Sequence, residues 1–187
     1  MTQLLTYEFS GSVARIAMDD GKLNVMSPDM LGALHEAFDR AEADGAIVIL
    51  SGREGIFSAG FDLKVISHGS PDEHHRMLSL GAELALRVLS FPTPVVSACA
   101  GHALPMGAFL MLASDVRIGA DGPFMIGLNE VAIGLTVPQF AIELARLRHR
   151  TTWYPAGSRE PPIVRREGRV SGLAPTSETA RGCVKTR

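Results

Sequence analysis

The stretch that decides the fold is VVSACAGHALPMGAFLMLA, residues 95–113. Its first six residues are β-branched, small or apolar, which is typical of a strand covered on both faces. A sharp turn at residues 101–107 follows, and the apolar run at 108–113 predicts a helix. The stretch therefore predicts a strand, a turn and a helix in succession, which is the repeating unit of α/β proteins.

A second stretch, FSAGFDL at residues 57–63, has the same design. Its turn is Ala59-Gly60-Phe61, and the turn of the first stretch is Pro105-Met106-Gly107. Such turns leave backbone N–H groups unpaired at the start of a helix, where they can bind an anion or a developing oxyanion. The alternative is that each glycine only permits a tight connection, which is the simpler explanation for any single turn.

The other segments of the first 147 residues continue this alternation of strands and helices. Ser27-Pro28 and Ser70-Pro71 are typical of a helix N-cap and first turn. From these signals and the apolar periods, the sequence predicts a hairpin at 4–18, a helix from 28 to about 44, a strand at 46–50, a helix from 71 to about 90, and strands at 95–100, 116–119 and 124–126.

Length and composition indicate one globular domain with a substantial core. The chain has 187 residues, of which 46% are hydrophobic and 20% charged, and this excludes collagen, coiled coil and wholesale disorder. No apolar run is long enough for a membrane span, so no membrane partner is expected. The first residues lack a basic segment with a long apolar run, and Cys99 and Cys183 lie far apart. We therefore expect a reducing compartment, the cytoplasm.

The charge balance changes near Arg148. Residues 1–147 hold nine Lys and Arg against 17 Asp and Glu, a balance of −8, whereas residues 148–187 hold nine against three, a balance of +6. The second segment also lacks a helical or strand period, so we expect an irregular or disordered basic tail after a core domain at 1–147. Nucleic acid is not an expected partner, because no run of Lys and Arg exceeds two. Out-of-frame translation of GC-rich DNA produces such a change, and we favour that interpretation of the tail.

Four ordered motifs, at residues 57–63, 95–108, 114–119 and 126–135, together resemble the crotonase (enoyl-CoA hydratase/isomerase) superfamily. The resemblance covers about residues 4–147 and implies an α/β spiral of ββα units that binds acyl-CoA. Because the resemblance ends there, we expect the family's C-terminal helical segment to be missing. The resemblance implies a homo-trimer or hexamer, and the loss of this segment makes a truncated acyl-CoA-binding protein without activity one alternative.

The resemblance also implies which groups bind the substrate. The thioester oxygen would lie between the backbone N–H groups of Phe61 and Met106, with Gly107 as the second donor if the alignment shifts by one residue. Removing a proton next to a thioester places negative charge on this oxygen, and one aimed donor lowers the barrier by about 3–4 kcal/mol. The further substrate-binding residues implied by the resemblance are Ser58, Ala59, Gly60, Asp62, Leu63 and Phe109.

Glu130 is the expected catalytic residue, and Phe109 decides which reaction is expected. Hydratases of this family have two glutamates, and the position of the first falls at Phe109, which cannot transfer protons. One carboxylate suffices for isomerisation, because it can remove a proton from C2 and return it at C4. The site pattern therefore resembles Δ3,Δ2-enoyl-CoA isomerases, with a hydratase that recruits another acid as the alternative. No cofactor is expected beyond the coenzyme A of the substrate.

Apolar neighbours are expected to raise the pKa of Glu130, since Ile126, Leu128, Val131 and Ile133 flank it. The other polar residues near the motifs have simpler interpretations. His102 is expected to be a hydrogen-bonded structural residue, and Asp62 and Asp115 are suited to capping turns and helices. His74-His75 has no third ligand at a suitable spacing, so no metal site is expected.

Overall fold

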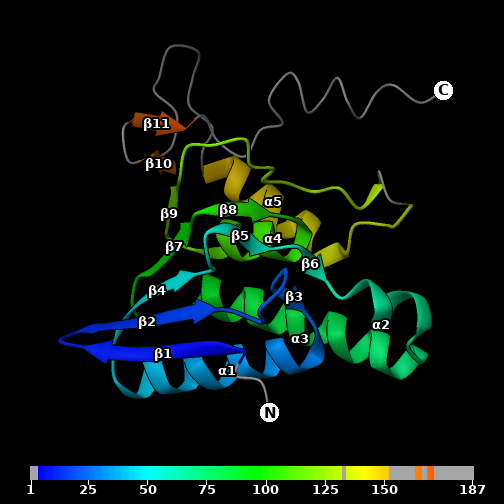
Figure 1. Ribbon diagram of the computed structural model, residues 1–187, viewed down its shortest axis with the longest axis horizontal. Coiled ribbons are helices and arrows are strands. Elements are labelled where there is room, and N and C mark those ends of the chain that lie inside the picture. The colour runs from blue at the N-terminus through cyan, green and yellow to red at the C-terminus, as the bar shows by residue number, and fades with distance from the viewer. Residues whose placement is uncertain (1–3, 132–133, 152–162, 166–167, 171–187) are drawn as a thin grey trace.

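The computed structural model describes residues 4–131, 134–151, 163–165 and 168–170 (Figure 1). Strands and helices alternate along the chain as follows: β1 (Leu5–Ser10), β2 (Val13–Met18), β3 (Val25–Met26), α1 (Pro28–Ala43), β4 (Ile47–Ser51), β5 (Gly55–Ser58), β6 (Gly60–Phe61), α2 (Leu63–His68), α3 (Pro71–Leu89), β7 (Val95–Cys99), β8 (Gly101–Ala103), α4 (Pro105–Ala113), β9 (Val116–Gly119), α5 (Gln139–Thr151), β10 (Ile163–Arg165) and β11 (Gly168–Val170).

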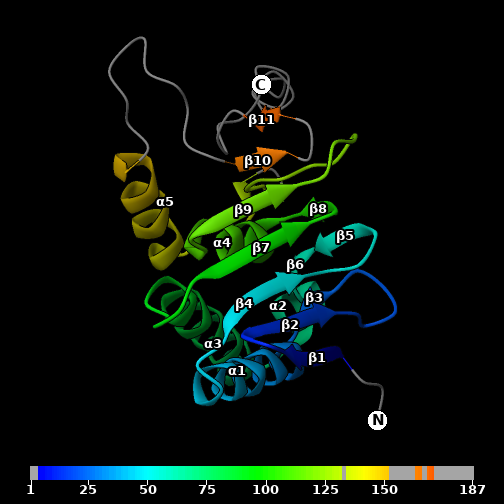
Figure 2. The same ribbon diagram turned by 90° about the vertical axis from the view of Figure 1, so that its left-hand side faces the viewer.

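The large sheet has the strand order β1-β2-β4-β7-β9-β10-β11. β1 and β2 form the predicted antiparallel hairpin, and β2, β4, β7 and β9 then run parallel to one another. Figure 2 shows these strands following one another across the molecule. Inward-facing side chains of β2 and β4 are buried in alternation, which is the pattern of a sheet with one face against the core.

Two small parallel pairs, β3 with β6 and β5 with β8, are formed by short strands that follow the large ones. A strand of the large sheet, a short strand and a helix thus succeed one another along the chain. This succession gives the ββα units that the sequence resemblance implies. The loops next to these short strands hold the candidate site.

The long helices begin where the sequence predicts. The hydroxyl of Ser27 accepts a hydrogen bond from the Met30 N–H, and Ser70 forms a reciprocal capping box with Glu73. Along the molecule α1 packs on α3, α3 on α4 and α4 on α5. Helix α4 is buried on nearly every side, which explains why its sequence is apolar all round.

The hairpin and the long helices are confirmed, and so are the strands at 46–50, 95–100 and 116–119, to within a residue or two. The helix predicted at 108–113 is present but begins at Pro105, within the predicted turn. The strand predicted at 124–126 is wrong, because only Ile126 forms an isolated bridge, to Ala103. Most of the predicted tail, 148–187, lies outside the described residues; within it α5 continues to Thr151, and β10 and β11 pair with each other. No helix in the described part of the chain is both long and apolar enough to cross a membrane.

Candidate active site

The first predicted donor loop, residues 57–63, is held by hydrogen bonds within the loop and to the segment at residues 23–24. The buried hydroxyl of Ser58 donates to the Asn24 carbonyl at 2.7 Å and accepts from the Gly60 N–H at 3.0 Å. The Ala59 N–H donates to the Leu23 carbonyl at 2.9 Å. Because Gly60 has a φ of +92°, a side chain at this position would be strained. The loop therefore holds one fixed conformation up to Phe61.

Asn24 supports this loop, and the sequence analysis did not single it out. Asn24 is fully buried with a φ of +50°, and its side-chain amide donates to the carbonyls of Met18 and Phe57 at 3.0 and 3.3 Å. The carboxylate of Asp20 accepts from the backbone N–H groups of Lys22, Asn24 and Val25. Asparagine is one of the few residues that adopts positive φ readily. The sequence signal for this turn is Asp20, because an aspartate side chain commonly accepts hydrogen bonds from the backbone N–H groups that follow it.

The second predicted donor turn leads from β8 into α4. The Leu104 N–H donates to the Ser58 carbonyl at 2.8 Å, which joins the two turns directly. The Gly107 N–H donates back to the Leu104 carbonyl at 2.7 Å and is thereby occupied. Met106 lies in the first turn of α4, where a backbone N–H has no acceptor within the helix.

The two turns pack so closely that their glycines leave no room for larger residues. A Cβ at Gly60 would lie 3.3 Å from Cδ of Pro105, and a Cβ at Gly107 would lie 2.9 Å from Cβ of Ser58. The structure therefore brings together the two loops that the sequence places more than 40 residues apart.

The side chains of Phe61 and Met106 meet at one point on α3. A Cβ at Gly81 would lie 2.6 Å from the Phe61 ring and 3.3 Å from the Met106 sulfur. Both side chains are buried, at 9% and 0% exposure. Gly81 thus makes room for the residues whose N–H groups are the expected donors, although nothing in the sequence analysis distinguished it.

Glu130 is buried, with 5% of its surface exposed, and among the described residues neither carboxylate oxygen has a hydrogen-bond partner. Burial raises the pKa of Glu130 above its ordinary value, and the nearby backbone N–H groups of Asn129 and Glu130 offset part of this rise. The direction agrees with the sequence prediction. Of the predicted flanking side chains, Ile126 packs against the core, whereas Leu128 and Val131 are 46% and 72% exposed. Ile133 lies outside the described residues.

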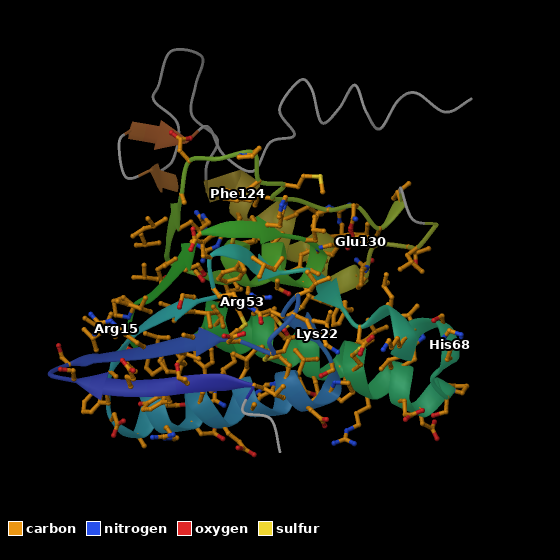
Figure 3. The ribbon with its side chains drawn as sticks, viewed as in Figure 1. Arg15, Lys22, Arg53, His68, Phe124 and Glu130 are labelled. Atoms are coloured by element: carbon orange, nitrogen blue, oxygen red, sulfur yellow. The ribbon has the colours of Figure 1, made fainter. Side chains whose placement is uncertain are left out.

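The connection that carries Glu130 is attached to β8, just before the second donor turn (Figure 3). The Ala103 N–H donates to the Met125 carbonyl at 2.9 Å, and the Gly127 N–H donates to the Ala103 carbonyl at 3.0 Å. His102 is hydrogen-bonded, as predicted, and accepts from the Met125 N–H at 3.0 Å.

Phe109 is fully buried in α4 and packs edge-to-face on Phe140 of α5, with ring centroids 5.5 Å apart. Asp62 caps α2 by accepting from the Lys64 N–H at 2.9 Å, as expected for this residue. Asp115 instead accepts from the Val95 N–H and joins the start of β7. Leu63, which follows the first donor turn, is 55% exposed.

No cluster that could hold a metal ion occurs among the described His, Cys, Asp and Glu side chains. An apolar groove of about 340 Å³ lies between α3 and α5, and it contains none of the predicted site residues.

Known proteins match this chain over the region that contains the site. A family model described as enoyl-CoA hydratase/isomerase matches residues 8–148. Among solved structures, an enoyl-CoA hydratase/isomerase family protein from Pseudomonas syringae is 48% identical with a TM-score of 0.74, and the match covers 76% of this chain and 62% of that one. An enoyl-CoA hydratase from Mycobacterium ulcerans is 45% identical with a TM-score of 0.75, covering 78% and 64%.

The human mitochondrial protein named enoyl-CoA delta isomerase 1 is 31% identical over 139 residues, which cover 72% of this chain and 46% of that protein. The chain spans about half the length of the curated relatives it matches, between 46% and 56% for three of them. The solved structures share the crotonase fold, so the predicted α/β fold class is confirmed. With a family model matching well over half of its residues, the chain belongs to the enoyl-CoA hydratase/isomerase family.

Proposed function

We propose that this protein is an enoyl-CoA isomerase that moves a double bond from C3 to C2 of an acyl-CoA. The observation that carries the proposal is the buried carboxylate of Glu130, whose two oxygens have no hydrogen-bond partner among the described residues. A carboxylate that is desolvated and unpaired is a stronger base than one in water, and it is free to face a substrate carbon.

In the proposed reaction, Glu130 removes a proton from C2 of a 3-enoyl-CoA. The electron pair moves toward the thioester carbonyl, and the resulting oxyanion accepts hydrogen bonds from the N–H groups of Phe61 and Met106. Glu130 then returns the proton at C4, and the carbonyl re-forms as the double bond settles between C2 and C3. Proton and electrons balance without any cofactor.

The hydrogen bond from Gly107 to Leu104 supports Met106 rather than Gly107 as the second donor. A donor that already binds a carbonyl at 2.7 Å is not available to a substrate oxygen. The contact of Phe61 and Met106 with Gly81 supports the pairing of these two residues in one site.

Phe109 supports isomerisation over hydration. Adding water across a double bond requires one group to orient the water and another to deliver a proton. A fully buried phenyl ring can do neither, and Phe140 packs on it. We propose that the side of the site occupied by the family's other glutamate is dry in this protein.

The test is to incubate the protein separately with a 3-enoyl-CoA and a 2-enoyl-CoA. Formation of the 2-enoyl isomer without 3-hydroxyacyl-CoA supports the proposal, and formation of 3-hydroxyacyl-CoA supports the hydratase alternative. The 45% identity to a hydratase from Mycobacterium ulcerans keeps that alternative in the test. Binding of CoA esters without either product would indicate an acyl-CoA-binding protein without activity.

A further inference from the structure

His102 joins the second donor turn to the connection that carries Glu130. It lies on β8, paired in register with Ile56 of β5 and two residues before Leu104. Its Nδ1 accepts the backbone N–H of Met125 at 3.0 Å, and its ring lies edge-to-face on Phe124 with centroids 5.6 Å apart. Figure 3 labels Phe124 and Glu130, which lie on the same connection between β9 and α5.

This hydrogen bond fixes the state of the imidazole ring. The Met125 backbone N–H can only donate, so Nδ1 must present a lone pair and the proton of the neutral ring must reside on Nε2. The His102 ring therefore acts as a specific hydrogen-bond acceptor for the Met125 N–H, in addition to its packing on Phe124.

One apolar side chain of the connection, that of Ile126, packs against the core. The side chains of Met125 and Leu128 are 57% and 46% exposed, so they do not tie it to the core. The carboxylate of Glu130 makes no hydrogen bond among the described residues. What attaches the connection to β8 is the pair of backbone bonds at Ala103, together with the bond from Met125 to His102.

We propose that His102 is a positioning residue, which holds the connection at residues 124–127 against β8 and thereby fixes Glu130 relative to the second oxyanion donor. The proposal rests on the proposed function of Glu130 as the proton carrier. Misplacing a catalytic group by about 1 Å can cost on the order of 100-fold in rate. A single hydrogen bond at the base of the connection is therefore enough to affect turnover without touching the substrate.

Three substitutions at His102 separate the acceptor from the ring. In His102→Asn, the amide oxygen can occupy the place of Nδ1, two bonds from Cβ. In His102→Gln, the amide lies one bond further out, in the place of Nε2, and His102→Leu has no acceptor. We expect kcat for 3-enoyl-CoA isomerisation to fall about 10- to 100-fold in the Gln and Leu variants, with KM changed less than about threefold. The Asn variant should keep kcat within about threefold of the wild type.

Two further readouts do not require activity. Hydrogen exchange of the Met125 amide should accelerate in the Gln and Leu variants and stay near the wild-type rate in the Asn variant. In an NMR titration of the Glu130 carboxyl group, the pKa should move toward its ordinary value in the Gln variant, because a looser connection admits water. If His102→Leu does not fold, as judged by circular dichroism, the Asn and Gln pair still provides the comparison.

Equal kcat values in the Asn and Gln variants, or an unchanged Met125 exchange rate in the Gln variant, would overturn the role of His102. A wild-type protein that converts neither enoyl-CoA would overturn the proposed function instead. In that case the exchange and titration measurements still decide whether His102 positions Glu130. Faster Met125 exchange and a Glu130 pKa nearer its ordinary value in the Gln variant, with wild-type behaviour in the Asn variant, support the role of His102. No difference between the two variants contradicts it.

Discussion

Glu130 combines three properties of a catalytic base: burial, a raised pKa and two oxygens without a partner in the described structure. We expect Glu130→Gln to reduce isomerase kcat about 100- to 10,000-fold, because it removes the proton carrier and keeps the shape. Affinity for a CoA ester should be nearly unchanged when measured by calorimetry. Wild-type activity should fall as the pH drops through the raised pKa, because the base must be ionised. A variant with wild-type turnover would remove Glu130 from the mechanism.

The same substitution should stabilise the fold at neutral pH. Because burial raises the pKa of Glu130, the folded state binds more protons than the unfolded state between the ordinary pKa and the raised one, so stability falls as the pH rises through that window. Glu130→Gln removes the buried charge, and the melting midpoint should rise at pH 7 by about 2–4 °C for each kcal/mol of penalty removed. At a pH below the ordinary glutamate pKa, the two proteins should melt at nearly the same temperature.

Phe109 provides the residue-level test of isomerisation against hydration. Phe109→Glu is expected to admit water and give a trace of 3-hydroxyacyl-CoA from a 2-enoyl-CoA, detectable by chromatography. It should also destabilise the protein by several kcal/mol, because a carboxylate replaces a fully buried ring that packs on Phe140. Phe109→Leu is the control, which creates space without a proton donor and should give no hydration. Hydration by the Leu variant would contradict the role given to Phe109.

At the scale of the helix, α3 contacts the side chains of both proposed donor residues at Gly81. Gly81→Ala would place a methyl group 2.6 Å from the buried Phe61 ring, so the ring must shift within the core beside the first donor turn. We expect isomerase kcat/KM to fall about tenfold or more. Gly32→Ala in α1 is the matched control, since nothing lies within 4 Å of the added Cβ and alanine favours a helix by roughly 0.5–1 kcal/mol. Activity in the Gly81 variant equal to that of the Gly32 variant would contradict this support.

Two arginines cap the end of α4, and one of them is Arg148. Its guanidinium donates to the carbonyls of Leu112, Ala113 and Ser114 at 2.7–3.1 Å, and Arg117 donates to carbonyls of the same turn. Cations at a helix C-terminus also interact favourably with the helix dipole. The residue at which the charge balance changes is therefore part of the folded core of the described structure.

We expect Arg148→Ala to lower the free energy of unfolding by about 1–3 kcal/mol in urea titrations, because it removes the guanidinium donor of the Ala113 carbonyl and leaves Arg117 alone to cap Leu112 and Ser114. Arg146→Ala on the same helix removes only an exposed ion pair with Glu143, and it should cost less than about 1 kcal/mol. Equal losses in the two variants would show that the cap contributes nothing beyond a surface charge.

Long elements could be predicted from the sequence because their signals are local. The N-caps Ser27 and Ser70 and the apolar periods of α1 and α3 lie within the elements themselves. The three-residue strand β8 and the two-residue strands β3 and β6 have no period to detect, since they exist only through pairing with distant segments. For the same reason Phe124 and Ile126 suggested a strand that the fold does not complete.

The motifs of the candidate site could be predicted from the sequence, but the residues that support these motifs could not. Glu130 and the two donor turns carry recognisable local patterns, whereas Gly81 and Asn24 acquire their roles from residues that fold against them. A helical glycine and a polar residue after a hairpin are common in any sequence. They become important only because the tertiary structure brings the Phe61 ring next to Gly81 and the Phe57 carbonyl next to Asn24.

At the scale of the whole molecule, the site is a product of contacts between segments far apart in the chain. Ser58 accepts from Leu104, Asn24 donates to Phe57, and Ala103 pairs with Ile126. We expect activity and helix content to disappear at the same urea concentration, because no part of the site lies within one local element. Activity that is lost at a clearly lower urea concentration than the circular dichroism signal would contradict this coupling.

We expect the parallel order of β2, β4, β7 and β9 also to set how quickly the proposed activity develops after synthesis or refolding. Parallel strands pair only after the helix between them has crossed over the sheet, so a long loop must close before the strand contacts stabilise the fold. Folds of this kind therefore form slowly, on the order of milliseconds to seconds. The two donor turns come together only when β8 reaches β5. If the proposed function holds, a newly made chain is therefore expected to show no isomerase activity until the last of these crossovers has formed. It should then gain this activity in a single step.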